Sequence, residues 1–213
     1  TSGLRKKVKH FQQVHYLDNF VQSIFLSHSE EEYKGKSIVI GGDGRFFNES
    51  AINTCIRICA GNGISKVIIP ENGLMSTPAV SLQVRSQTDC FGAIILTASH
   101  NPGGEHEDFG IKFNNKAGAP APENVTGKIF ENTKTIKEIK YVDHDFKLNE
   151  AVKLNVEGSP FEVCIESSTA LYVNKMRELF NFEKIKTLFE RKDFNFVFDG
   201  MHGASGPYAI RSE

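Results

Sequence analysis

The sequence has no run of 18 apolar residues, so it predicts no membrane-spanning helix. Neither sign of charge is in excess, because the sequence has 25 Lys and Arg residues and 26 Asp and Glu residues. A net charge of −1 gives no overall attraction to nucleic acid. No signal peptide or lipidation motif is visible. We therefore expect a cytoplasmic protein whose partners are small molecules, with neither nucleic acid nor a membrane among them.

Cysteine is scarce, with four in 213 residues, and it does not form a metal-binding pattern. Cys55 and Cys59 stand four residues apart among apolar residues, which places both thiols on one buried helix face. A metal pair is disfavoured, since there is no Cys-x-x-Cys and no histidine partner nearby. The pattern favours structural thiols in a reducing compartment.

Helical and strand-like segments alternate along the chain, which predicts an α/β fold with a mixed sheet flanked by helices. The segment 139–160 is polar and reads as an irregular connection. Expected helices span about 14–28, 49–60, 77–86, 122–138, 167–180 and 183–190. Expected strands span 36–41, 66–70, 91–97, 109–114, 161–165 and 194–199.

The last predicted strand runs into a glycine turn and resembles the start of a new unit. We therefore expect a first domain over 1–190 and the beginning of a second, similar α/β domain over 191–213. The chain begins at Thr1 without methionine and stops at Glu213, a few residues into an expected helix. Both ends suggest a fragment of a longer protein.

The loop at 97–104 (TASHNPGG) is the strongest functional signal, because Ser99 and His100 directly follow a buried strand. A tight loop at a strand end presents a serine hydroxyl where a substrate can reach it. A protease-type Ser–His pair is disfavoured, since adjacent side chains are expected to diverge and no Gly-x-Ser-x-Gly elbow is present. A serine hydrolase is thus a weak alternative to a serine that carries a phosphoryl group, which needs cations and N–H donors around it.

Two cationic side chains are candidates for that environment. Lys112 alternates with the apolar Phe109, Ile111 and Phe113, so it faces the opposite side of its strand, either as a solvated lysine or beside the serine loop. Arg5 stands in the basic start of the chain, which reads either as disorder or as a glycine loop that grips phosphate.

Two glycine turns are weaker signals. The segment 41–45 (GGDGR) resembles a phosphate-binding turn but lacks the rest of a Walker A motif, so we favour a structural turn in which Arg45 bonds locally. His202 stands at an expected strand end, where α/β folds place sites, although a single histidine of this kind is more often structural.

Together these segments resemble the α-D-phosphohexomutase superfamily, and its phosphoglucomutase branch most closely. They occur in the family's order over nearly the whole chain. The segments that carry the resemblance are 1–8 (TSGLRKKV), 41–46 (GGDGRF), 72–79 (NGLMSTPA), 97–104, 108–114 (DFGIKFN), 120–123 (PAPE), 201–203 (MHG) and 206–208 (GPY).

The resemblance implies an intramolecular phosphotransferase that interconverts glucose 1-phosphate and glucose 6-phosphate through glucose 1,6-bisphosphate. Ser99 would carry the phosphoryl group and contact Mg²⁺ through that phosphate. Arg5 would contact phosphate, and His100 and Lys112 would transfer protons and neutralise charge. A phosphoserine carries about −1.5 to −2 charge near neutrality, which explains the need for such a cationic set. The full-length protein would be monomeric.

The family's metal loop, Asp-Gly-Asp-Gly-Asp-Arg, and its sugar loop, Gly-Glu-Glu-Ser, do not occur in this sequence. The remaining metal ligands are therefore absent from the chain, and we expect it to be inactive alone. Two alternatives stay open: a phosphomannomutase-like or other sugar-phosphate mutase, and a non-catalytic, parafusin-like phosphoprotein.

Overall fold

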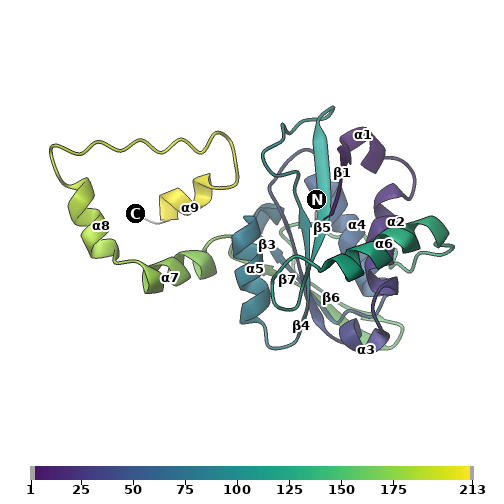
Figure 1. The fold of residues 1–213 in the computed structure, drawn as a ribbon. Helices are drawn as coiled ribbons and strands as arrows, with labels where there is room; N and C mark the ends of the chain where they lie inside the picture. Colours follow the sequence, from purple (N-terminus) through teal and green to yellow (C-terminus); the bar gives the residue numbers. More distant parts are fainter. Residues whose placement is uncertain (1–2, 212–213) are drawn as a thin grey trace.

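The computed structural model describes residues 3–211, and its centre is a seven-stranded sheet (Figure 1). Predictions for Thr1, Ser2, Ser212 and Glu213 lie outside the described residues. The strand order is β1-β5-β4-β2-β3-β7-β6, with β4, β2, β3 and β7 parallel and the outer pairings antiparallel. This mixed sheet confirms the predicted α/β fold. The strands are β1 (Gly3–Lys7), β2 (Ser37–Gly42), β3 (Lys66–Pro70), β4 (Cys90–Leu96), β5 (Asp108–Asn115), β6 (Val152–Val156) and β7 (Ser159–Glu166).

Helices cover both faces of this sheet (Figure 1). Helices α2, α4 and α6 lie on one face and α5 on the other, and each face has its own apolar cluster. Since both faces are covered, every residue of β4 is buried, which explains its unbroken apolar sequence. The helices of this part are α1 (Val8–Phe11), α2 (Tyr16–Leu26), α3 (Glu30–Tyr33), α4 (Asn48–Gly61), a 3₁₀ turn η1 (Glu71–Gly73), α5 (Thr77–Ser86) and α6 (Glu123–Thr135).

The cysteine pair lies where its spacing predicts. Cys55 and Cys59 are fully buried on α4, and burial raises the pKa of both thiols. A thiol with a raised pKa is a poor nucleophile and a poor metal ligand. The two cysteines therefore act as small core residues.

In the described part of the N-terminal segment, residues 3–7, neither a disordered start nor a glycine loop is found. Residues Gly3–Lys7 form β1, which pairs antiparallel with β5. Gly3 lies directly opposite Lys112, where a Cβ atom would stand 2.3 Å from the Ile111 carbonyl oxygen. Pairing with β5 satisfies the backbone groups on one side of this edge strand, and Leu4 packs against the main core.

The expectation of an irregular connection over 139–160 is wrong at its end. Val152–Val156 forms β6, and a tight hairpin turn through Glu157 and Gly158, both at positive φ, leads into β7. The alternation of Val152, Leu154 and Val156 with polar residues is the signal for this edge strand.

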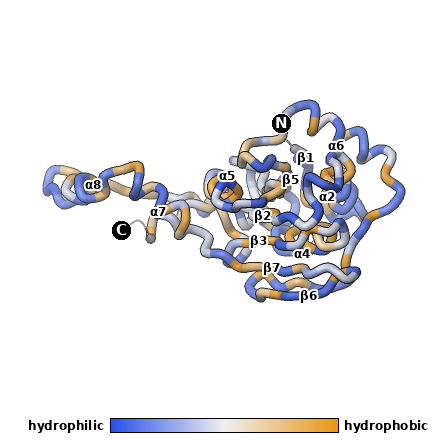
Figure 2. Tube along the Cα trace, turned by 90° about the horizontal axis from the view of Figure 1, so that it is seen from below, coloured by the Kyte–Doolittle hydropathy of each residue, from blue (hydrophilic) through white to orange (hydrophobic). Residues whose placement is uncertain are grey.

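Residues 170–211 form an arm that extends away from the sheet (Figures 1 and 2). The arm holds α7 (Ala170–Leu179), α8 (Phe182–Phe189) and α9 (Gly206–Arg211). It is fastened by the Tyr208 hydroxyl, which donates to the Ser168 carbonyl (2.9 Å) and accepts from the Ser76 amide (3.0 Å). No helix within residues 3–211 is long and apolar enough to cross a membrane.

The predicted strand at 194–199 is wrong, because these residues form no regular element. Within the described part of the chain no strand runs beside them, so their amide and carbonyl groups have no ladder partner. Phe196 and Val197 are consequently exposed. The domain boundary near residue 190 stays a prediction.

Gly110 offers a test of how tightly the sheet is packed at the serine loop. A Cβ atom there would lie 2.2 Å from the Thr97 carbonyl oxygen, whereas one at Gly127, inside α6, would meet nothing within 4 Å. We expect Gly110→Ala to lower the free energy of unfolding by about 2–3 kcal/mol, since backbone must shift. Gly127→Ala should raise it by about 0.5–1 kcal/mol. Urea unfolding of both variants measures the difference, and equal effects would contradict the packing described here.

Candidate active site

The serine loop lies at the carboxyl ends of the parallel strands, the edge at which α/β sheets form their sites. Residues 97–107 connect β4 to β5, and the turn 43–47 follows the adjacent strand β2. The two segments meet directly, since the Thr97 hydroxyl donates to Asp43 Oδ2 (2.7 Å). The sheet thus brings together two glycine-containing segments that are more than 50 positions apart in the sequence.

Ser99 is exposed, and its backbone adopts the left-handed conformation with φ 59°. Its Oγ atom lies 3.1 Å from His100 Nδ1, so the expectation that these neighbouring side chains diverge is wrong. The left-handed turn at Ser99 redirects the chain and brings the two side chains together. In residues 3–211 no carboxylate bonds the His100 ring, so the third member of a hydrolase triad has no candidate here.

Thr97 and Asp43 hold the Ser99 backbone through hydrogen bonds. The Thr97 hydroxyl accepts a hydrogen bond from the Ser99 amide (2.9 Å) and donates to Asp43 Oδ2 (2.7 Å). The carboxylate of Asp43 in turn pairs with the Arg45 guanidinium, whose Nη2 lies 2.8 Å from Oδ2. A continuous chain of hydrogen bonds therefore links the turn after β2 to the backbone of Ser99.

Arg45 is the most deeply enclosed charged side chain of this region, with 7% of its side chain exposed. Besides Asp43, its guanidinium donates to the Ser99 carbonyl (3.2 Å) and to the Asp108 carbonyl (2.7 Å). The prediction of a local structural role is confirmed by the Asp43 pair. The contacts to residues 54 and 63 positions away are additional, and no sequence motif indicated them.

The far end of the loop has its own polar anchor. Asn101 Nδ2 donates to Asp108 Oδ2 (2.6 Å), and Lys7 Nζ lies 3.0 Å from Asp108 Oδ1. These hydrogen bonds, from Asn101 first and Lys7 second, hold the pKa of the Asp108 carboxyl below its usual value. The aspartate therefore stays ionised and joins the loop to β1.

Arg5 and Lys112 lie on the same face of the sheet, as neighbours on paired strands. Arg5 stands opposite Gly110 and Gly3 opposite Lys112, so both side chains point away from the buried Phe109 and Ile111. Burial and then the nearby charge of Arg5 lower the pKa of the Lys112 amine. The prediction that Lys112 faces away from the apolar set is confirmed.

One row of the sheet connects these cations to the serine loop. The Thr97 amide donates to the Gly110 carbonyl (2.8 Å), and Gly110 stands opposite Arg5. Strands lie about 5 Å apart, so Arg5 and Thr97 lie on opposite sides of β5, two strand spacings from each other. His100 thus contacts Ser99 directly, whereas Arg5 and Lys112 lie on β1 and β5, the strands next to β4 at this side of the sheet.

The chain offers little for a metal ion by itself. No group of three or more His, Cys, Asp or Glu side chains within residues 3–211 is placed to hold one. The nearest carboxylates, Asp43 and Asp108, are already paired with Arg45 and Lys7. The carboxylates described in residues 3–211 therefore do not form a magnesium site by themselves.

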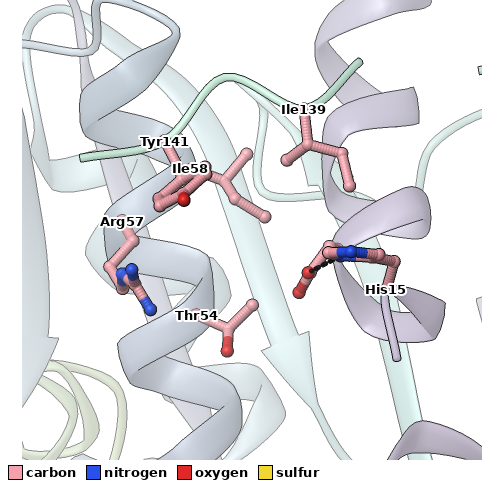
Figure 3. A pocket seen from close by; sticks show the side chains of 7 residues that line it. His15, Thr54, Arg57, Ile58, Ile139 and Tyr141 are labelled. Carbon is pink, nitrogen blue, oxygen red and sulfur yellow. Dashed lines mark hydrogen bonds and ion pairs between the residues drawn. The ribbon is translucent and has the colours of Figure 1, made fainter. Parts of the chain in front are cut away.

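A separate cavity of about 250 Å³ lies between α2 and α4 (Figure 3). Its charged groups have partners within the chain, since His15 Nδ1 bonds Asp18 (2.9 Å) and Arg57 Nη2 pairs with Asp143 (2.8 Å). None of the four predicted site residues lines it. His202, the remaining candidate, is exposed in the turn before α9.

Comparison with known proteins agrees with this geometry. The model of the phosphoglucomutase/phosphomannomutase family, alpha/beta/alpha domain I, matches residues 1–140. The chain belongs to this family. The resemblance inferred from the motifs is thereby confirmed.

Individual members of the family resemble the chain over nearly its whole length. Phosphoglucomutase-2 of Paramecium tetraurelia is 50% identical over 98% of the chain and 39% of that relative. The cytoplasmic phosphoglucomutase of Bromus inermis is 48% identical over 99% of the chain and 38% of that relative. The chain therefore spans about two fifths of the length of these family members.

A solved structure shows the same fold. The open form of the exocytosis-sensitive phosphoprotein pp63/parafusin (phosphoglucomutase) from Paramecium superposes with a TM-score of 0.95. It is 48% identical, and the match covers 99% of this chain and 40% of that one. At this identity the fold, including the arm, is that of a phosphoglucomutase family member.

Proposed function

We propose that the protein to which this chain belongs is a phosphoglucomutase, which interconverts glucose 1-phosphate and glucose 6-phosphate. The observation that carries the proposal is an exposed serine hydroxyl at the end of β4, with His100 3.1 Å away and Arg5 and Lys112 on the adjoining sheet face. Such a setting suits a hydroxyl that exchanges a dianionic group. Relatives 48–50% identical carry the name phosphoglucomutase.

In this proposal the phosphoryl group rests on Ser99 Oγ. When glucose 1-phosphate binds, its 6-hydroxyl oxygen forms a bond to phosphorus while the bond from Ser99 Oγ breaks, giving glucose 1,6-bisphosphate. Transfer of the 1-phosphoryl group back to Ser99 then releases glucose 6-phosphate. Arg5 binds phosphate through its guanidinium fork. Lys112, whose pKa is lowered, and His100 accept and return the hydroxyl proton.

Mg²⁺ on the Ser99 phosphate would supply charge neutralisation. Because residues 3–211 hold no group of three or more His, Cys, Asp or Glu placed for a metal, we expect the other ligands to come from the remainder of the full-length protein and the 213-residue chain alone not to turn over. A cytoplasmic location and a monomeric full-length protein belong to the same proposal, and cytoplasmic relatives support the first.

Two observations support alternative functions, and the experiment must distinguish them from the proposed one. The family model covers phosphomannomutases, and the parafusin relative is described as an exocytosis-sensitive phosphoprotein. The experiment uses protein purified from its natural source, assayed with glucose 1-phosphate and with mannose 1-phosphate, together with peptide mapping of Ser99. We expect faster turnover of the glucose ester and a Ser99 peptide about 80 Da heavier from its phosphate. Faster mannose turnover would favour the phosphomannomutase, and phosphate on Ser99 without turnover would favour the phosphoprotein.

A further inference from the structure

The backbone of Ser99 requires support from its surroundings. A residue with a Cβ atom in the left-handed region costs about 1–2 kcal/mol relative to a relaxed conformation. Ser99 holds φ 59° although it is exposed and is followed by Asn101 and Pro102 in an irregular loop. Such a conformation persists only where neighbouring groups fix it. The question is therefore which side chain holds the Ser99 peptide.

Arg45 Nη2 donates to the Ser99 carbonyl (3.2 Å), and the Thr97 hydroxyl is the side-chain group that holds the Ser99 amide (2.9 Å). The Asp43 carboxylate can only accept hydrogen bonds, so the hydroxyl proton of Thr97 must point to Asp43 Oδ2, 2.7 Å away. The oxygen lone pair then remains to accept the Ser99 amide at 2.9 Å. The donor and the acceptor of both hydrogen bonds at the Thr97 hydroxyl are thus determined.

Arg45 holds the Asp43 carboxylate, at the other end of this series of hydrogen bonds. Its Nε and Nη2 atoms both donate to the Asp43 carboxylate, at 2.9–3.0 Å and 2.8 Å. The Thr97 amide is itself held by the Gly110 carbonyl (2.8 Å), so Thr97 cannot turn away. A rigid sheet position and a nearly buried ion pair together orient one hydroxyl toward the Ser99 amide.

We propose that Thr97 is a positioning residue for the Ser99 nucleophile, an inference that rests on the proposed function. Its hydroxyl keeps the Ser99 peptide in the left-handed conformation, so that Oγ is displayed beside His100. Thr97 has this effect through the Ser99 backbone and contacts no substrate. Small displacements of a reacting atom are costly, about a hundredfold in rate for 1 Å.

The test compares Thr97→Val, which keeps the shape and removes the hydroxyl, with Thr97→Ser, which keeps the hydroxyl. In the full-length natural protein we expect Thr97→Val to lower kcat by about tenfold to a hundredfold with KM nearly unchanged. Thr97→Ser should retain most of kcat. Hydrogen exchange of the Ser99 amide, measured in the same full-length protein, should accelerate in the valine variant and not in the serine variant. Thr97→Ala repeats the test if the valine variant fails to fold.

The outcomes separate the two proposals. Unchanged kcat and unchanged exchange in Thr97→Val would overturn the positioning role, as would equal losses in the valine and serine variants. A wild-type protein that neither turns over sugar phosphates nor carries phosphate on Ser99 would instead overturn the proposed function. In that case the exchange measurement still decides whether Thr97 holds the loop.

Discussion

Ser99→Ala is expected to lower mutase activity of the full-length protein by at least about 10³-fold, because it removes the atom that carries the phosphoryl group. The same variant should no longer acquire phosphate in this loop. Its fold should be retained, since Ser99 is exposed and its side chain makes one hydrogen bond, to His100. Alanine also tolerates the left-handed backbone no worse than serine. A loss of activity with an unchanged melting temperature is therefore the predicted combination.

The measurement needs a control for serine removal itself. Ser159 is exposed at the start of β7, far along the sheet from β4, and Ser159→Ala should leave rate and phosphate unchanged. Coupled assay of glucose 6-phosphate formation and peptide mapping of both variants give the comparison. If Ser99→Ala keeps a normal rate, or if phosphate persists in the 97–104 peptide, the assignment of Ser99 is refuted.

Local sequence was sufficient for the serine loop and for Lys112. The buried run of β4 and the alternation in β5 fix where each strand ends and which way its side chains face. In the structure β5 returns antiparallel to β4 and pairs Lys112 with Ile95. These features depend on contacts between neighbouring segments.

Local sequence patterns do not reveal the residues that hold the serine loop and β1 in place. Arg45 reads as part of a turn, and its contact with Ser99 exists only because β2 and β4 are adjacent in the sheet. Likewise β1 has a basic, unpatterned sequence, and its pairing with β5 decides its conformation. The candidate site residues are thus visible in local sequence, whereas long-range strand pairing decides which groups hold them.

Arg45→Ala is expected to destabilise the chain by about 3–5 kcal/mol, the cost of breaking a buried ion pair by removing one partner. The side chain is 7% exposed and its partner Asp43 is 21% exposed, so little water is available to replace the lost contacts. The Ser99 and Asp108 carbonyls lose a donor at the same time. At about 2–4 °C per kcal/mol for a domain of this size, the melting temperature should fall by roughly 10 °C.

The chain contains a matched control. Arg191 pairs with Asp193, also two positions away, but both side chains are more than half exposed. Arg191→Ala should therefore cost no more than about 1 kcal/mol. Arg45→Lys should fall between the two, because lysine keeps the charge and loses the fork that reaches Asp43 and the two carbonyls together. Thermal unfolding of the three variants decides the matter: equal losses in Arg45→Ala and Arg191→Ala would mean that the Arg45 pair does not hold the loop. A large loss only at Arg45 would show that the enclosed pair with Asp43, together with the contacts to the Ser99 and Asp108 carbonyls, contributes to the stability of the chain.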